Sequence, residues 1–226
     1  MTEPDPITGF VAAKGHSSRV PGKNMRDFGG RPLVHHILQA LTDAQLVARV
    51  VLDSDSDDIL SSAAEAFPDL ELIRRPAELC GDDVPMNDLI RNACEVTGVD
   101  VILQTHATSP LLTPDSIDGA VRAFRANPGA TSLFSVNALQ TRLYWDDLRP
   151  INHNPAELLP TQDLPVIYEE NSNIYIVETE ALIRCGHRVT DQTMVFVMPD
   201  PLESIDIDTE SDFLLAEAVY AFQQAS

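Results

Sequence analysis

Two groups of charged residues, far apart in the chain, have the types and spacing to carry out chemistry on a phosphate. The first is the stretch 10–24 (FVAAKGHSSRVPGKN), where an apolar run leads into a loop of Gly, Ser, Lys and Arg. Backbone N–H groups and cationic side chains in such a loop can hold an anion. The second group is Asp206 and Asp208, which alternate with isoleucines. Two carboxylates on one face of an extended segment repel each other unless a divalent cation lies between them, and such hard oxygen ligands suit Mg²⁺.

The charge of the first loop is opposite to that of the whole chain. The 226 residues carry a formal net charge of −20. Five of the 15 Lys and Arg fall between Lys14 and Arg31, and with Asp27 as the one acid among them they leave a local charge of +4. The overall charge argues against nucleic acid or an anionic membrane as a partner. An anionic substrate therefore needs a local cationic site, although a merely basic surface loop is the alternative.

Composition predicts one soluble domain over residues 1–226, because 44% hydrophobic residues in a chain of this length can fill one core. There is no basic and apolar leader at the N-terminus and no apolar run of 18 residues, so a cytoplasmic protein is expected. Cys80, Cys94 and Cys185 are odd in number and widely spaced. They are expected to be buried thiols, not disulfides or zinc ligands.

Strands and helices alternate along the sequence in the way that could position the two groups. Strands are expected at 9–13, 49–53, 70–73, 100–104, 130–136 and 195–198, and helices at 33–44, after 88 to about 98, at 114–127 and after a capping box at Thr209 and Asp212. Residues 1–6 are expected to form a frayed tail, and the acidic stretch 54–58 a helix cap. This order predicts a three-layer, Rossmann-like α/β fold with a mostly parallel sheet and ligands at the strand ends.

Residues 137–171 break the alternation. They contain the aromatic pair Tyr144-Trp145 and four prolines, and they show no clear helical pattern or sheet partner. A loop of this length in a compact domain is usually functional or serves assembly, and exposed aromatic residues favour interfaces. We expect an extended arm that contributes to a homodimer.

The basic loop also resembles the signature of a known family. Lys14-Gly-x-Ser-Ser-Arg-Val-Pro-Gly-Lys-Asn24, followed by Gly-Gly-Arg-Pro-Leu, is similar to the motif of the acylneuraminate cytidylyltransferases. Matching segments follow in the family order at 75–79 (RPAEL), 108–111 (TSPL) and 204–210 (SIDIDTE), so the resemblance covers about residues 10–216. It implies a nucleotidyltransferase with a Rossmann-like fold. The enzyme would transfer CMP from CTP to the anomeric hydroxyl of a nonulosonic (sialic-type) 2-keto sugar acid and release pyrophosphate.

The resemblance also implies a role for individual residues. The implied catalytic set is Lys14, Lys23, Asp206 and Asp208, of which the two aspartates would hold Mg²⁺ as the cofactor. Implied nucleotide contacts are Lys14, Gly15, Ser17, Lys23, Asn24, Arg75, Asp82 and His106. Implied contacts to the sugar acid are Gln104, Gln162, Tyr168 and Asn171. In the family, the segment that corresponds to 137–171 reaches a second subunit and covers the sugar, which again implies a homodimer.

The chain departs from the family pattern at several of these positions. Lys14 stands where most members have Arg, which keeps the charge but loses the two-pronged geometry of a guanidinium. His106 stands in the place of a family Gln, and Ser172-Asn173 replace Gly-Ala. Glu169 stands where some sialic-acid members have Arg. An acid near a carboxylate substrate repels it, which leaves open a sugar other than N-acetylneuraminate.

Several alternatives remain at this stage. CMP-KDO synthesis or activation of another small acid is one, although CMP-KDO synthetases usually have Pro at the position of Asn24. A non-catalytic nucleotide-binding homologue is another. A dinucleotide-dependent oxidoreductase is disfavoured, because Gly15 is the one glycine between Ala13 and Pro21 and no GxGxxG motif exists. Arg75 could instead form a surface ion pair with Glu78, and the two aspartates could be a solvent-facing acidic pair.

Overall fold

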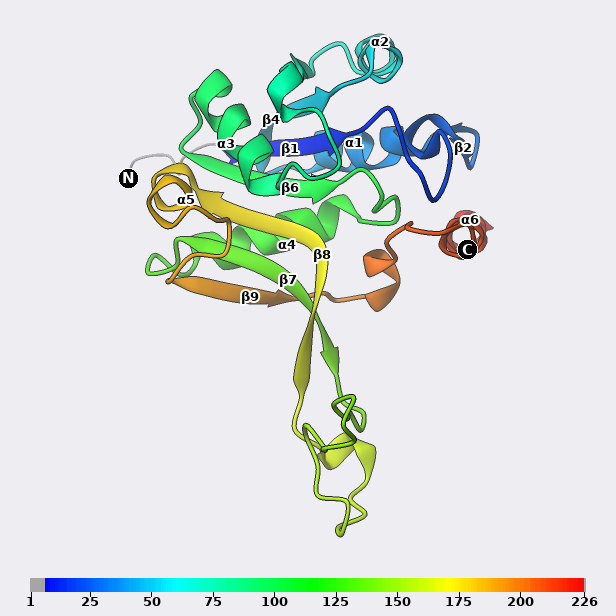
Figure 1. The fold of residues 1–226 in the computed structure, drawn as a ribbon, viewed down its shortest axis with the longest axis vertical. Helices are drawn as coiled ribbons and strands as arrows, with labels where there is room; N and C mark the ends of the chain where they lie inside the picture. The colour runs from blue at the N-terminus through cyan, green and yellow to red at the C-terminus, as the bar shows by residue number, and fades with distance from the viewer. Residues whose placement is uncertain (1–6, 226) are drawn as a thin grey trace.

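A seven-stranded sheet runs through the body of the protein in the order β5-β4-β1-β6-β8-β7-β9 (Figure 1). The computed structural model describes residues 7–225, so the tail expected at 1–6 lies outside the described residues. The strands are β1 (Ile7–Ala13), β4 (Val47–Ser54), β5 (Glu71–Arg74), β6 (Val101–His106), β7 (Ser132–Leu139), β8 (Ile167–Glu178) and β9 (Thr193–Val197). β8 is antiparallel to both neighbours, and the other pairings are parallel. The predicted mostly parallel sheet is confirmed.

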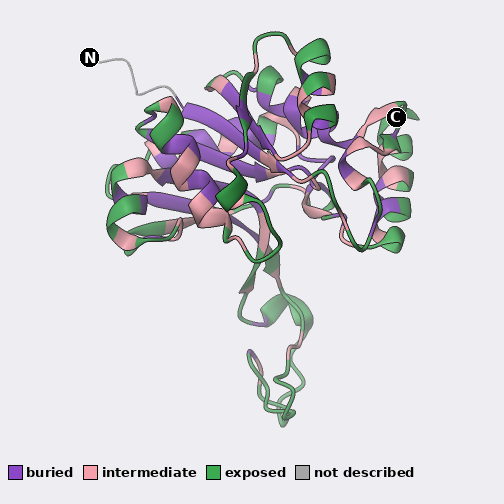
Figure 2. Ribbon diagram, turned by 45° about the horizontal axis from the view of Figure 1, so that its top comes forward, coloured by how far each residue is buried: buried purple, intermediate pink, exposed green. Residues whose placement is uncertain are grey.

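Helices cover both faces of this sheet. On one face lie α1 (Leu33–Asp43), α2 (Asp57–Ala66) and α4 (Pro114–Arg125), whose apolar sides share a core with alternate residues of β1 and β6. On the other face lie α3 (Met86–Thr97) and α5 (Thr179–Cys185), which form a second core. Figure 2 shows the sheet as the buried centre between exposed helical surfaces. Strands covered on both faces are largely apolar, and β1 is apolar except at Thr8. The predicted three layers are confirmed.

The helix starts follow the sequence signals. Ser56 Oγ accepts the Ile59 N–H at 3.4 Å at the start of α2, so the acidic stretch 54–58 is a cap, as predicted. Thr113 Oγ1 accepts the Ser116 N–H at 3.3 Å at the start of α4, and Pro114 occupies its first turn. The ends of these helices are therefore set by local residues.

A third apolar cluster joins the basic loop to the C-terminal helix α6 (Glu210–Ala225). Its centre is Phe28, which packs edge-on against Phe213 with ring centroids 5.6 Å apart. Phe28 belongs to a short hairpin, β2 (Asp27–Phe28) and β3 (Arg31–Pro32), whose turn residues Gly29 and Gly30 have φ of +57° and +94°. A Cβ on Gly29 would lie 2.3 Å from the Tyr220 ring of α6. The cluster thus holds the basic loop beside the segment that carries Asp206 and Asp208.

The arm leaves the sheet as a two-stranded ribbon (Figure 1). β7 and β8 stay paired along it, with Ala138 opposite Tyr168 and Leu139 opposite Ile167. The expectation that 137–171 lacks a sheet partner is therefore wrong for the base of the arm, where β7 and β8 are paired. Beyond the ribbon the backbone is irregular apart from a short helix, η3 (Thr161–Asp163). The buried Asn152 holds this part together, because its Nδ2 donates to Thr141 O at 2.7 Å and to Pro165 O at 3.1 Å.

All three cysteines are free thiols, as expected. Cys94 is buried, but Cys80 is exposed and Cys185 is half-buried. The expectation of burial is therefore wrong for Cys80, which follows a short helix, η2 (Ala77–Leu79), at the protein surface. In the part of the chain that the structure describes, no helix has the length and apolar character needed to cross a membrane.

Candidate active site

A cavity of about 250 Å³ opens where the loops that follow β1 and β6 meet. β1 and β6 are adjacent parallel strands, and open α/β sheets bind ligands at the carboxyl ends of their strands. The lining residues are Ala12, Lys14, His16, Ser17, Ser18, Arg19, Lys23, Asn24, Arg75, Asp82, Met86, Leu89, His106, Ala107 and Thr108. Seven of the eight predicted nucleotide contacts line this cavity; Gly15 does not.

The first turn of the basic loop is closed by its own hydrogen bonds. Asn24 Nδ2 donates to Lys14 O at 2.8 Å, and the Gly15 N–H donates to Asp55 Oδ1 at 2.6 Å. A Cβ on Gly15 would lie 2.8 Å from Ser56 Cβ, so this close approach requires glycine. The Gly15 N–H is thus occupied by Asp55 in this structure and is not offered to a phosphate.

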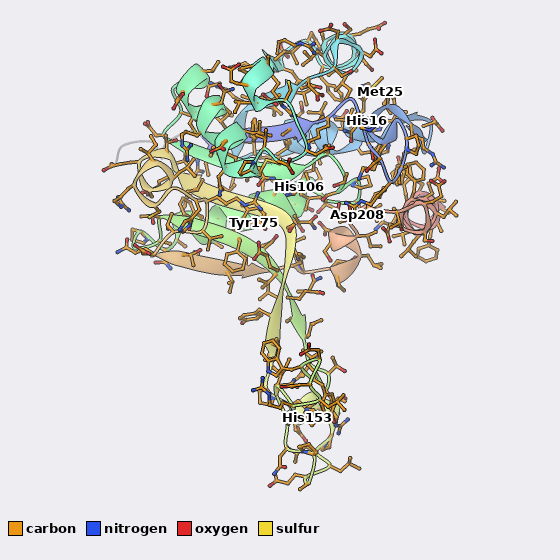
Figure 3. All side chains as sticks on the ribbon, in the orientation of Figure 1. His16, Met25, His106, His153, Tyr175 and Asp208 are labelled. Atoms are coloured by element: carbon orange, nitrogen blue, oxygen red, sulfur yellow. The ribbon has the colours of Figure 1, made fainter. Side chains whose placement is uncertain are left out.

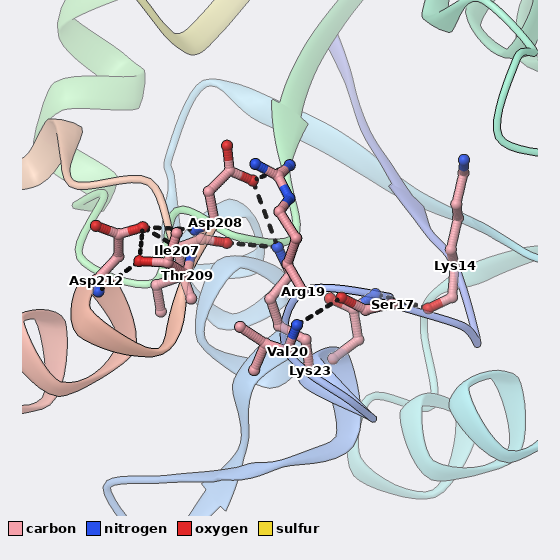
Figure 4. Close-up of polar contacts among 10 residues, drawn as sticks. Lys14, Ser17, Arg19, Val20, Lys23, Ile207, Asp208, Thr209 and Asp212 are labelled. Atoms are coloured by element: carbon pink, nitrogen blue, oxygen red, sulfur yellow. Dashed lines mark hydrogen bonds and ion pairs between the residues drawn. The ribbon is translucent and has the colours of Figure 1, made fainter.

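Two cations of the loop contact Asp208, one member of the predicted acidic pair (Figure 4). Arg19 Nη2 donates to Asp208 Oδ1 at 2.8 Å, and Lys23 Nζ lies 3.8 Å from the same oxygen. Lys23 Nζ also donates to Ile207 O. The Lys23 side chain is largely buried, at 11% exposure, and this burial lowers its pKa although the charge of Asp208 opposes the shift. The two charged groups identified in the sequence are therefore one cluster.

Residues 205–208 form an extended connection, as the alternation predicts, and pair with no strand among the described residues. Its one sheet-like bond runs from the Ile207 N–H to Thr108 O at 3.0 Å. Ile207 is buried in the cluster around Phe28. The alternation therefore survives without a strand, because Ile207 is buried while Asp206 is exposed and Asp208 is half-buried.

Asp206 lies against Thr108 at the edge of the cavity. Asp206 is exposed at the surface, and partial loss of water around its carboxyl raises its pKa. The negative charge of Asp208 adds to this rise, while the Thr108 hydroxyl and Lys23 oppose it. The two carboxylates are thus close enough to repel each other. The predicted capping box behind them is present, because Thr209 N donates to Asp212 Oδ2 at 2.7 Å and Asp212 N donates to Thr209 Oγ1 at 3.3 Å.

Arg75 pairs with Asp53 and not with Glu78. Its Nε lies 2.5 Å from Asp53 Oδ1, and the two side chains are 1% and 0% exposed. Arg75 follows β5 directly and Asp53 is on the adjacent strand β4, so the pairing of the strands brings them together. Burial raises the pKa of Asp53 although the charge of Arg75 opposes it. Arg75 Nη1 is buried without a hydrogen-bond partner among the described residues, which leaves it available to a ligand in the cavity.

Two further polar atoms of the cavity wall are buried without a partner in the described part of the chain, namely Asn24 Oδ1 and His106 Nε2. Burial lowers the pKa of His106 to about 4, and the positive charge of Arg188 contributes to the shift. The imidazole is therefore neutral at pH 7. Unpaired buried polar groups are costly unless a ligand or water satisfies them. These atoms indicate a polar ligand that the cavity is built to hold.

The remaining cavity residues lie nearer its rim. Lys14 Nζ lies 3.1 Å from Asp82 Oδ1, and both side chains are partly or largely exposed. Ser17 Oγ accepts the Val20 N–H at 3.4 Å. An exposed ion pair is readily exchanged for another partner, so Lys14 is accessible to an anion. Ser17 is half-buried at the same rim.

The predicted sugar contacts do not line this cavity. Gln162 and Tyr168 are exposed on the arm, and Asn171 lies at its base, where Ser135 Oγ donates to Asn171 Oδ1 at 2.6 Å. Gln104 is fully buried on β6, two residues before His106. Figure 3 shows the same separation, with His106 and Asp208 at the sheet and His153 far out on the arm.

The sequence did not single out Arg19, Asp53 or Arg188 as site residues. Arg19 stands inside the basic loop, and its charge was the available signal. Asp53 ends an apolar strand, which is a usual place for a site residue in a parallel sheet. Arg188 has no local pattern around it that marks it.

A profile of the cytidylyltransferase family matches residues 8–225. The chain is 26% identical to the CMP-N,N'-diacetyllegionaminic acid synthase of Legionella pneumophila, over 96% of this chain and 97% of that protein. It is also 26% identical to the pseudaminic acid cytidylyltransferase of Campylobacter jejuni, with the same coverage. The N-acylneuraminate cytidylyltransferase of Oncorhynchus mykiss is 29% identical, over 93% of this chain and 49% of that protein.

Solved structures agree at the level of the fold. CMP:2-keto-3-deoxy-manno-octonic acid synthetase in complex with CTP superposes with a TM-score of 0.68 at 12% identity, over 96% of this chain and 99% of that one. The 4-diphosphocytidyl-2C-methyl-D-erythritol synthase of Anaerococcus prevotii gives the same TM-score at 13% identity, over 96% of both chains. With a family profile that spans nearly all of the described residues, this chain belongs to the cytidylyltransferase family.

Proposed function

We propose that the protein transfers CMP from CTP to the anomeric hydroxyl of a nonulosonic acid and releases pyrophosphate. The observation that carries the proposal is the cavity, which is lined by cations of the basic loop and by three buried polar atoms without a partner among the described residues, while Arg19 and Lys23 of that loop contact Asp208. The relatives named for legionaminic, pseudaminic and N-acylneuraminic acid support this substrate class.

The side chains suit the transfer of a nucleotidyl group. The sugar hydroxyl oxygen forms a bond to the α-phosphorus, the bond to the bridging oxygen breaks, and pyrophosphate leaves with the electron pair while the hydroxyl gives up its proton. Such a reaction depends chiefly on positioning and on stabilisation of charge. Lys14, Lys23 and Arg19 would hold the triphosphate, and Lys23 would offset charge on the leaving pyrophosphate. Asn24, Arg75 and His106 would bind the remainder of the nucleotide.

Asp206 and Asp208 fit a divalent cation by their chemistry. Both are hard oxygen ligands, and the charge of Asp208 raises the pKa of Asp206, a repulsion that a cation would relieve. Within the described residues no group of three or more His, Cys, Asp or Glu could hold a metal. Two carboxylates suffice for Mg²⁺, which usually keeps water and substrate phosphates as its other ligands. When bound there, Mg²⁺ would supply polarisation of the α-phosphate.

CTP is expected to be used in preference to ATP, GTP and UTP. The assay is pyrophosphate release from each of the four nucleotides, with and without a panel of N-acetylneuraminic, legionaminic, pseudaminic and 3-deoxy-manno-octulosonic acids. The last acid tests the CMP-KDO alternative, which a 29% match over 54% of this chain to such an enzyme of Geobacter sulfurreducens keeps in view. Equal turnover with UTP, or none with CTP across the whole panel, would reject the proposal.

We also propose a homodimer in which the arm of each subunit covers the sugar site of the other. The arm carries a row of exposed apolar side chains, which favours an interface: Tyr144, Trp145, Leu148, Ile151, Leu158, Leu159, Val166 and Tyr168. In that arrangement Gln162, Tyr168 and Asn171 would contact the sugar of the neighbouring subunit.

Light scattering at micromolar protein is expected to give twice the mass of the 24.8 kDa chain. Trp145→Ser together with Leu148→Ser is expected to shift the mass toward the monomer, because it removes apolar area from the arm. Leu214→Ser together with Leu215→Ser, on the exposed side of α6, is the matched control. A monomeric wild type contradicts the proposal.

A further inference from the structure

Arg188 lies on the connection between α5 and β9 and is held over the sheet by three contacts. Its guanidinium carbon is 3.5 Å from the centroid of the Tyr175 ring. Its Nη1 donates to Gln104 Oε1, and its backbone N–H donates to Asn87 Oδ1 at 3.2 Å. Gln104 and Tyr175 are directly opposite each other on β6 and β8, so the guanidinium is set above two adjacent strands.

This cation has no counterion of its own. Among residues 7–225 no carboxylate is recorded within ion-pair distance of Arg188, whereas nine other ion pairs are. The acid whose charge acts on it is Glu170, and that carboxylate accepts the Tyr175 hydroxyl. Burial lowers the pKa of Arg188, so the charge is partly removed from water. A half-buried charge without a partner is unfavourable, and a neutral side chain could fill the same space without that cost.

Arg188 also borders an open space. A surface cavity of about 550 Å³ is lined by Met86, Asn87, His187, Arg188 and Val189. Met86 also lines the nucleotide cavity, so the two spaces are neighbours. Arg188 and Asp208 both act electrostatically on His106, which lines the nucleotide cavity.

We propose that Arg188 binds the carboxylate of the acceptor acid. The planar guanidinium fork matches a carboxylate, and stacking on Tyr175 with the Gln104 bond fixes its orientation in advance. The partial loss of water makes each such bond stronger than on an open surface. This assignment rests on the proposed function, because it takes the acceptor to be a sugar acid. Arg188 would thereby select an acid over a neutral sugar.

The test compares Arg188→Gln and Arg188→Lys with the wild type, using the acid of the panel that gives the fastest pyrophosphate release. In Arg188→Gln we expect KM for the acid to rise by on the order of tenfold to a hundredfold, since a charged hydrogen bond is lost, and KM for CTP to stay within about twofold. In Arg188→Lys, KM for the acid should lie between those of the wild type and Arg188→Gln, because lysine keeps the charge without the planar fork of a guanidinium. Arg184→Gln, an exposed arginine in the last turn of α5, is the matched control and should behave as wild type.

A second readout separates carboxylate binding from a role in holding the loop. The carboxamide of the same acid is measured as a competitive inhibitor, and the preference of the wild type for acid over amide is expected to disappear in Arg188→Gln. An unchanged KM for the acid, or an equal rise of both KM values together with a lower melting temperature, would overturn the assignment of Arg188 while the proposed function stands. Absence of pyrophosphate release by the wild type with every acid would overturn both.

Discussion

Asp208→Asn is expected to lower kcat by on the order of a hundredfold or more while the protein stays folded. The change removes a negative oxygen ligand and keeps the size of the side chain. Loss of charge stabilisation at a reacting phosphate costs roughly 3 kcal/mol in the transition state, which is about a hundredfold in rate. The fold should survive, because the Asp208 side chain is 44% exposed and its contact with Arg19 is a surface ion pair, worth about 1 kcal/mol or less. Steady-state kinetics across a Mg²⁺ titration, with a melting curve alongside, measure both quantities.

A control for this change lies two residues away. Glu210 pairs with Arg26 at 2.7 Å and is exposed, so Glu210→Gln removes a carboxylate from the same region without touching the acidic pair. Its rate should stay near that of the wild type. Part of the loss in Asp208→Asn should be recovered at high Mg²⁺ if the defect is one of affinity. A folded Asp208→Asn variant with a near-normal rate at every Mg²⁺ concentration would end the metal-site proposal and favour the solvent-facing acidic pair.

The parts of the fold that could be predicted are those that local sequence determines. The apolar runs, the capping residues at Ser56 and Thr113 and the proline at the start of α4 all act within a few residues of the elements they define. The ribbon of the arm was missed because its pairing joins residues about 30 positions apart, across a proline-rich segment with no alternating pattern. The extended segment at 205–208 forms no strand among the described residues, because an extended segment becomes a strand only through hydrogen bonds to a partner strand.

The candidate site also has parts that local sequence predicts and parts that depend on residues distant in the sequence. The basic loop and the acidic pair could be identified because each is a short motif, and their contact through Lys23, Asp208 and Ile207 adds to what the motifs imply. The partner of Arg75 could not be identified, because Asp53 is adjacent in space through strand pairing and not in sequence. Arg188 was missed because it lies on a connection, and its neighbours Gln104 and Tyr175 come from two strands distant from it in the sequence. The roles of the individual site residues stay predictions that the variants above test.

The buried pair of Arg75 and Asp53 leads to the second large effect, which is on stability. Asp53→Ala is expected to lower the free energy of unfolding by about 3–5 kcal/mol, because it leaves the Arg75 charge in a site with 1% exposure and no counterion. Urea denaturation followed by circular dichroism measures the change. Glu71→Ala, which breaks the exposed pair with Arg49 at 2.9 Å, is the matched control and should cost about 1 kcal/mol or less. Equal losses in the two variants would contradict the assigned burial.

The double variant Asp53→Leu with Arg75→Met separates the structural role of this pair from its role toward the nucleotide. Both side chains are almost fully buried, and taking two charges out of water can cost as much as their attraction returns. Replacing both by apolar side chains of similar volume should therefore restore most of the stability. KM for CTP should nevertheless be higher than in the wild type, because the unpartnered Nη1 donor of Arg75 at the cavity wall is gone. If stability and KM both recover, Arg75 is a structural residue, and the nucleotide must be held by the basic loop without it.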